Sequence, residues 1–205
     1  MRSNAGASGW KTQLVLYPVF AVTGMAHVVG GALMPSIAAT FHLSDSQSGT
    51  LFLLYFGGSA LGALLCRGSY SRILWIGFLV MTVCSVGVAY SPAALLPFAF
   101  LLLGISVGIP MSAVSLYVGR NIIERRAAFL TLLNFTWSCG ALISPLLAGR
   151  ILDHHSYRTV YLVIAASAFV SAIVCALALR DGHELEADAQ PQAVSTVLRL
   201  ILIFA

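Results

Sequence analysis

Six long apolar runs, separated by short polar segments, organise the sequence. They cover residues 12–37, 47–66, 73–90, 93–118, 131–152 and 159–179, and a further apolar run begins at residue 196. Each of the six can cross a hydrocarbon core of about 30 Å as a helix that rises about 1.5 Å per residue. The pattern therefore predicts an all-α polytopic membrane protein with six transmembrane helices and the start of a seventh, truncated one.

The composition agrees with a chain surrounded by lipid. Of the 205 residues, 59% are hydrophobic and 9% are charged, whereas soluble domains carry about 25% charged residues. The four cysteines lie in or at the ends of apolar runs and lack the spacing of metal ligands. We therefore expect no metal and no cofactor, and four free thiols: Cys66, Cys84, Cys139 and Cys175.

The basic residues are unevenly divided between the two ends of the predicted helices. Nine lie on the side of the N-terminus and two, Arg150 and Arg158, lie on the other side. Because cytoplasmic loops are enriched in Lys and Arg, this bias predicts a multi-pass protein of the cell membrane with a cytoplasmic N-terminus. The formal net charge of +4 arises in these short loops and does not indicate nucleic-acid binding.

Polarity divides the chain into four segments. Residues 1–11 form a short N-terminal tail, in which residues 1–10 are expected to be disordered, and residues 12–179 form the six-helix domain. Residues 180–195 contain the acidic, solvated stretch and are predicted to be a cytoplasmic linker. Residues 196–205 begin the seventh helix.

Small residues recur four positions apart, which lets helix backbones approach closely in a membrane. In the second and fourth runs, the pairs are Gly58 with Gly62 and Gly104 with Gly108. The fifth run has Gly140 and a predicted contact face made of Ala141, Pro145 and Gly149. A proline within a helix removes one backbone donor and favours a kink, so Pro145 is a predicted hinge.

His27 is the strongly titratable side chain deepest in an apolar run. It lies 16 residues after Lys11 and 15 before His42, near the middle of the first helix. Two interpretations are open. His27 lines a cavity and binds a solute or a coupling proton, or it is a neutral histidine bonded to a backbone carbonyl of another helix. Thr23 is a further candidate near the same face.

Polar and aromatic residues of the fifth and second helices are the other candidates for binding a solute. Asn134 and Trp137 are three residues apart and share a helix face, and an amide with an indole can hold a sugar or another neutral polar solute. The alternatives are an interhelical hydrogen bond for Asn134 and packing or lipid contact for Trp137. Tyr55 and Ser59, four apart in the second helix, are candidates of the same kind.

One motif raises an enzymatic alternative. The segment from Gly104 to Gly108 matches the G-x-S-x-G pattern of a serine nucleophile. However, no strand is predicted before Ser106, and the sixth run lacks the histidine that an intramembrane serine protease would need. Close packing at glycines explains the pattern more simply, so we do not expect an enzyme.

Four segments together resemble the N-terminal six-helix half of the major facilitator superfamily. They are Ser48-Gly49-Thr-Leu at the start of the second helix, residues 62–67 with Arg72, residues 139–149 in the fifth helix, and Tyr157-Arg158 before the sixth. In this resemblance, Arg67 and Arg72 belong to the family's loop motif between helices two and three.

The resemblance implies two inverted three-helix repeats and secondary transport of a small-molecule solute by alternating access. Helices one, two, four and five would then form the binding face. The Gly-rich first helix and Leu133-Asn134-Phe135 look most like sugar–proton symporters of the fucose permease type. That subgroup implies a sugar substrate and makes His27 the candidate for proton coupling.

The chain also departs from the family pattern. Cys66 stands where the loop motif has an acid, and Ser69-Tyr70 replaces its Gly-Arg pair. Phe100 stands near the place of an arginine found in many proton-coupled members. The family usually has twelve helices, so the expected partner is a missing C-terminal half or a second copy. The alternative function is a non-transporting six-helix subunit or a truncated half-transporter.

Overall fold

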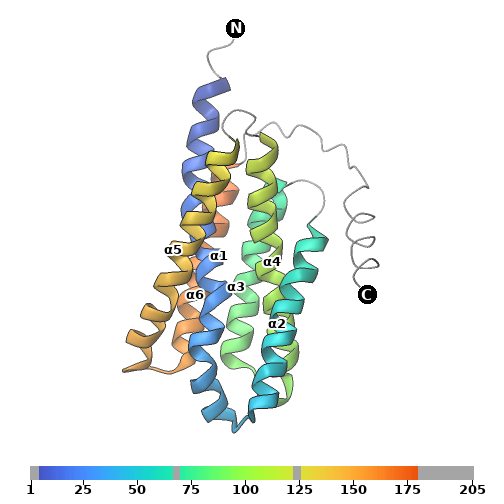
Figure 1. The fold of residues 1–205 in the computed structure, drawn as a ribbon, viewed down its shortest axis with the longest axis vertical. Helices are drawn as coiled ribbons and strands as arrows, with labels where there is room; N and C mark the ends of the chain where they lie inside the picture. The colour runs from blue at the N-terminus through green and yellow to red at the C-terminus, as the bar shows by residue number, and fades with distance from the viewer. Residues whose placement is uncertain (1–4, 67–69, 122–125, 180–205) are drawn as a thin grey trace.

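The computed structural model describes residues 5–66, 70–121 and 126–179, which form six long helices (Figure 1). These are α1 Ala5–Phe41, α2 Asp45–Leu65, α3 Tyr70–Tyr90, α4 Leu96–Asn121, α5 Arg126–Leu152 and α6 Tyr157–Ala178, with the short 3-10 helix η1 Ala93–Leu95 before α4. The described residues contain no strand, and all six helices are long and apolar enough to cross a membrane. The predicted all-α fold with six transmembrane helices is confirmed.

Several helices extend beyond their predicted ends. α1 begins at Ala5, so part of the tail that was expected to be disordered is helical. α3 begins at Tyr70, which places Arg72 within a helix instead of a loop. A helix can continue beyond the hydrocarbon core, so hydropathy marks the part of a helix in lipid and not its hydrogen-bonded ends. Arg67 and residues 180–205, with the predicted linker and seventh helix, lie outside the described residues.

The turn between α1 and α2 has well-defined local chemistry. His42 follows α1 with a positive φ of 54°, a conformation that ends helices. Ser44 then caps α2: the backbone N–H of Gln47 donates to the Ser44 hydroxyl at 3.3 Å, and the Ser44 N–H donates to Gln47 Oε1 at 2.8 Å. This capping box satisfies two backbone donors and fixes the first residue of α2.

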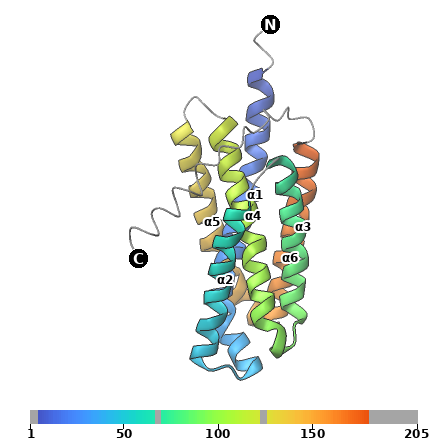
Figure 2. The same ribbon diagram turned by 90° about the vertical axis from the view of Figure 1, so that its right-hand side faces the viewer.

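The six helices form two outer pairs around two central helices. Figure 2 shows α3 and α6 along one side of the bundle, α2 and α5 along the other, and α1 and α4 between them. The contacts agree: α2 packs on α4, α1 on α5, and α3 on α6, while α1 also meets α6 and α3 meets α4. α5 and α2 are the least buried of the six helices. They border a face of the bundle that its other helices do not cover.

The α4–α2 contact repeats the α1–α5 contact. A Cβ atom on Gly104 of α4 would collide with the carbonyl oxygen of Tyr55 and approach the backbone nitrogen of Ser59 within 3.1 Å. A Cβ on Gly24 of α1 would collide with the carbonyl oxygen of Trp137 and approach the nitrogen of Ala141 within 3.2 Å. Gly24 and Gly104 are 80 positions apart, and Tyr55 and Trp137 are 82 apart, as are Ser59 and Ala141.

The same offsets relate a second set of contacts. Gly140 lies against the carbonyl of Ala21 in the α1–α5 pair, and Gly58 lies against the carbonyl of Leu101 in the α4–α2 pair. Each helix pair therefore has the same glycine-to-carbonyl register. This repetition is the structural basis of two three-helix repeats, α1–α3 and α4–α6.

The contact of α5 with α1 uses a face one residue away from the predicted one. The predicted face is Ala141, Pro145 and Gly149, but Pro145 and Gly149 are exposed, and a Cβ on Gly149 would have no neighbour within 4 Å. The buried positions are Gly140, Ser144 and Ala148. Both sets repeat every four residues, so periodicity alone could not choose between them. The Ser144 hydroxyl donates to the Met25 carbonyl at 2.9 Å and fixes the observed choice.

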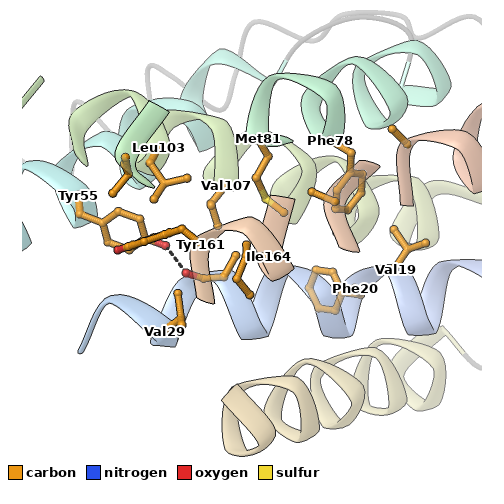
Figure 3. Packing of buried hydrophobic residues seen from close by; sticks show 14 of the residues in the cluster. Val19, Phe20, Val29, Tyr55, Phe78, Met81, Leu103, Val107, Tyr161 and Ile164 are labelled. Atoms are coloured by element: carbon orange, nitrogen blue, oxygen red, sulfur yellow. Dashed lines mark hydrogen bonds between the residues drawn. The ribbon is translucent and has the colours of Figure 1, made fainter. Parts of the chain in front are cut away.

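A continuous apolar core fills the space between α1, α3, α4 and α6. Figure 3 shows Phe20 of α1, Phe78 of α3, Val107 of α4 and Tyr161 of α6 within it, and all four are buried. In a protein surrounded by water, burying one such side chain stabilises the fold by about 1.5–3 kcal/mol. In lipid the same contacts stabilise the bundle through close packing of the helices. This core holds α1 and α4 in place behind the uncovered face.

Candidate functional site

Three rings from α2 and α5 lie around the ring of His27 in α1. The ring centroid of His27 lies 5.8 Å from that of Tyr55, 5.3 Å from that of Phe56 and 5.8 Å from that of Trp137. We call these four residues the aromatic cluster. It joins α1, α2 and α5, and it reaches the surface through Phe56, which is 48% exposed. The structure thus brings His27 together with two of the residues that the sequence analysis singled out, Tyr55 and Trp137.

Two nitrogen atoms of the aromatic cluster are buried without a hydrogen-bond partner among the described residues. They are Nδ1 of His27 and Nε1 of Trp137. Buried polar atoms in proteins are nearly always bonded, because an unpaired one costs about 1–3 kcal/mol. The alternative interpretation of His27, a bond to a neighbouring carbonyl, is therefore not realised at Nδ1. An indole N–H and an imidazole nitrogen within one cluster can bind an external polar group.

Tyr55 has a different role in the cluster. Its hydroxyl donates to the carbonyl oxygen of Ala26 at 2.9 Å, and the side chain is 3% exposed. This bond ties α2 to α1 directly beside His27. Tyr55 and Trp137 occupy equivalent positions in the two repeats, but the polar atom of Tyr55 is used by the helix bundle. Tyr55 therefore shapes the cluster through its ring.

Asn134 lies on the surface of α5, one turn before Trp137. Its backbone carbonyl accepts a bond from the Ser138 hydroxyl at 3.0 Å, and its side-chain amide makes no interhelical hydrogen bond with the described residues. The exposed amide lies on the helix face that also carries Trp137. Contact between Asn134 and a solute stays a prediction, and the exposure of the Asn134 side chain favours this contact.

Thr23 and Ser59 are part of the helix packing. Thr23 is fully buried, and its hydroxyl donates to the Phe20 carbonyl at 2.7 Å within α1. Ser59 is also buried, and its backbone lies against Gly104 and Gly108 of α4. Contact of either side chain with a solute stays a prediction, and the burial of both side chains does not favour such contact. A hydroxyl in an apolar run can indicate a solute site, but Ser and Thr side chains in membrane helices also bond the backbone of their own helix.

The G-x-S-x-G segment is helical. Ser106 lies inside α4, is fully buried, and donates to the Leu103 carbonyl at 2.7 Å. Its flanking glycines, Gly104 and Gly108, are the positions at which α2 approaches most closely. This environment has the close-packing role that the glycine spacing predicts and lacks the exposed turn that a nucleophile needs.

Phe56 of the aromatic cluster and its neighbour Phe52 were not among the residues predicted from the sequence. Phe56 contacts His27, and Phe52 stacks on Phe56 with ring centroids 6.2 Å apart and an interplanar angle of 16°. In an apolar helix a phenylalanine gives the same signal whether it faces lipid or a site. The available clue was the spacing: Phe52, Tyr55 and Phe56 lie three and four residues apart and share one face.

Solved structures share this fold. The chain superposes on a peptide transporter, POT, solved as the E310Q mutant in complex with sulfate, with a TM-score of 0.66 and 15% sequence identity over 94% of this chain and 42% of that one. The same transporter with alafosfalin gives a TM-score of 0.67 and 16% identity over 96% of this chain and 44% of that one. At these identities the likeness concerns the fold alone.

Curated relatives are similar in sequence. The chain is 27% identical to sodium-dependent glucose transporter 1 of Danio rerio over 160 residues, which are 73% of this chain and 26% of that protein. It is 26% identical to the cis,cis-muconate transport protein of Acinetobacter baylyi over 175 residues, or 79% of this chain and 41% of the relative. The chain thus spans less than half the length of these relatives.

The family model described as Major Facilitator Superfamily matches residues 16–204, which is nearly the whole sequence. The six-helix arrangement, the repeated glycine contacts and the segments noted in the sequence agree with that match. The chain therefore belongs to the Major Facilitator Superfamily, a family of membrane transporters.

Proposed function

We propose that this chain forms the six-helix half of a secondary transporter that moves a small polar solute, in the first instance a sugar, across the cell membrane. Transport would occur by alternating access in symport with a proton, with the N-terminus on the cytoplasmic side. The aromatic cluster would contact the solute. His27 would accept the coupling proton, and Trp137 and Asn134 would donate hydrogen bonds to the solute.

One observation carries this proposal: two nitrogens without a hydrogen-bond partner in the described part of the chain, of His27 and Trp137, lie in the aromatic cluster beside the uncovered face. Aromatic rings pack against the apolar face of a sugar, while N–H groups bind its hydroxyls. A histidine titrates near neutral pH and can take up and release a proton during a transport cycle. A polar group in a membrane span without a protein partner is a functional candidate by default.

The uncovered face supports a second part of the proposal. α2 and α5 expose large apolar side chains such as Leu53, Phe56, Leu142 and Leu146. We propose that a second six-helix unit, from a longer chain or a second copy, completes the solute site over the aromatic cluster. The relatives, of which this chain spans less than half, have the length that this arrangement requires.

The test is uptake of labelled D-glucose by cells that express the protein, measured at acidic and alkaline external pH. Loss of one hydrogen bond to a neutral solute should cost about 0.5–1.5 kcal/mol, so Asn134→Ala and Trp137→Phe should raise KM about two- to tenfold. His27→Ala should remove the dependence of uptake on the proton gradient. Tyr90→Phe, at the exposed far end of α3, is the control and should leave uptake unchanged.

Unchanged affinity and rate in both His27→Ala and Asn134→Ala would remove these residues from the site. Labelled cis,cis-muconate serves as the second probe. Uptake of muconate without glucose uptake would overturn the assignment of a sugar, and uptake of neither by an expressed, folded protein would favour the non-transporting alternative.

A further inference from the structure

Three tyrosine hydroxyls lie buried where α1, α2 and α6 meet. Tyr157 and Tyr161 are one turn apart on α6, with 2% and 0% of their surface exposed, and neither hydroxyl has a hydrogen-bond partner among the described residues. The third, Tyr55, donates to the Ala26 carbonyl. An unbonded buried hydroxyl costs about 1–3 kcal/mol, whereas phenylalanine would fill the same space without that cost. Packing alone therefore does not explain the two α6 tyrosines.

The structure has room beside one of these hydroxyls. Gly30 of α1 is buried, yet a Cβ atom at Gly30 would have a single neighbour outside its own helix within 4 Å, the hydroxyl oxygen of Tyr161 at 4.0 Å. The missing side chain thus leaves a space about the size of a methyl group next to a buried hydroxyl. Buried water occupies such spaces when they are roomy enough and offer polar partners.

The tyrosines form a series from the end of the bundle to the aromatic cluster. Tyr157 and Tyr161 lie four residues apart on one face of α6, and Figure 3 shows Tyr161 beside Tyr55. Tyr55 in turn contacts the ring of His27. At the other end, Tyr157 is the first buried residue after the exposed segment 153–156. That segment joins α5 to α6 at the end of the bundle opposite the N-terminus (Figure 1).

We propose that the space beside Gly30 binds water and that Tyr157 and Tyr161 form with this water a path that carries protons between the α5–α6 connection and His27, which lies three residues before Gly30 on the same face of α1. This inference rests on the proposed coupling role of His27. Each hydroxyl and each water can donate and accept. A proton enters from the solvent at Tyr157, and in each transfer between oxygens one O–H bond breaks while another forms on the next oxygen. In the last transfer an O–H bond of the water breaks and an N–H bond forms on an imidazole nitrogen of His27, and no electrons are transferred.

Hydration is tested first, with water as the probe. Radiolytic hydroxyl-radical labelling of the purified protein marks side chains that contact bound water. Tyr161 and Tyr157 should be labelled clearly above Phe78 and Phe100, which are equally buried rings without a polar atom. Gly30→Ala should lower the labelling of Tyr161, because the new methyl group occupies the water's place at an ordinary contact distance. Labelling of Tyr161 as low as that of Phe78 would overturn the proposal.

Proton delivery is tested second, with the proton as the probe. A protonated imidazole quenches a nearby indole, so Trp137 reports the protonation of His27 in a background in which Trp10 and Trp75 are replaced by phenylalanine. After a rapid pH jump, Tyr161→Phe should slow the fluorescence change about tenfold, an added barrier of about 1.4 kcal/mol, without changing its final amplitude. The control is Tyr17→Phe, which should leave the rate unchanged. It removes another buried hydroxyl without a partner in the described ranges, but one that lies ten residues before His27.

The remaining outcomes also decide the question. An unchanged rate in Tyr161→Phe would refute the path even if the site is hydrated. If Tyr161→Phe loses its helical circular dichroism, Gly30→Ala replaces it in the rate measurement. A fluorescence response that survives in His27→Ala would overturn both the coupling role of His27 and the path to it, whereas a response that is lost there but unaffected by Tyr161→Phe would overturn the path alone.

Discussion

Two adjacent glycines of α2 allow a direct test of how this bundle is held together. A Cβ atom on Gly58 would lie 2.5 Å from the carbonyl oxygen of Leu101 and 3.2 Å from the backbone nitrogen of Ile105, both in α4. A Cβ on Gly57 would have no neighbour within 4 Å. The substitutions Gly57→Ala and Gly58→Ala therefore add the same methyl group at consecutive positions, and only the second methyl group meets the neighbouring backbone.

The expected difference can be worked from these contacts. Within a helix, alanine is more stabilising than glycine by about 0.5–1 kcal/mol. This stabilisation applies to both variants and cancels when their free energies of unfolding are compared. At Gly58 the colliding atoms are backbone atoms that cannot rotate away, so α2 and α4 must separate. Overpacking of this kind costs about 1–3 kcal/mol. The equilibrium constants of unfolding should therefore differ by about 5- to 150-fold between the two variants.

The measurement is reversible unfolding in mixed micelles of increasing SDS content, followed by far-ultraviolet circular dichroism. Gly57→Ala should be at least as stable as the parent protein, and Gly58→Ala should unfold at a lower midpoint with the same slope. If the two variants unfold at the same midpoint, backbone contact at the glycines does not hold α2 to α4. That result would also remove the main structural support for the repeated contact in the two halves of the bundle.

Three other substitutions test single hydrogen bonds by the same unfolding measurement. Tyr55→Phe removes the bond to Ala26 and should destabilise the bundle by about 0.6–1.5 kcal/mol. Ser144→Ala removes the bond to Met25 and should have a similar effect on the α1–α5 contact. Ser44→Ala removes the cap of α2 and should cost about 1 kcal/mol. Midpoints equal to that of the parent would show that water or lipid replaces the lost bond at no cost.

The number and order of the helices could be predicted because lipid imposes a strong constraint on sequence. A span must satisfy its own backbone and expose apolar side chains, so six runs of sufficient length could only be helices. The exact contact faces could not be predicted. In α5, residues 140, 144 and 148 and residues 141, 145 and 149 have the same period, and the choice depends on where α1 presents Met25 and Ala21.

The candidate site could be predicted in part. His27 and Trp137 stand out because polar atoms are rare at mid-depth in a membrane helix, and the structure brings their rings together. Thr23 gave a comparable signal, but its hydroxyl bonds the Phe20 carbonyl of its own helix. Ser59 also gave this signal, and its backbone packs against Gly104 and Gly108. Phe56 gave no signal by its residue type, because a phenylalanine that faces lipid and one that faces a site look the same in the sequence, and only its spacing from Phe52 and Tyr55 was a clue.

The equivalence of Tyr55 and Trp137 has a consequence for where a ligand would rest. The two side chains occupy equivalent positions in the two repeats. The Tyr55 hydroxyl donates to the Ala26 carbonyl, whereas the Trp137 N–H has no hydrogen-bond partner among the described residues. The backbone arrangement is thus the same in the two repeats, but only the α5 side offers an unbonded donor. A bound molecule would sit off the internal dyad, closer to α5 than to α2, and a photoreactive ligand analogue should cross-link mainly to α5.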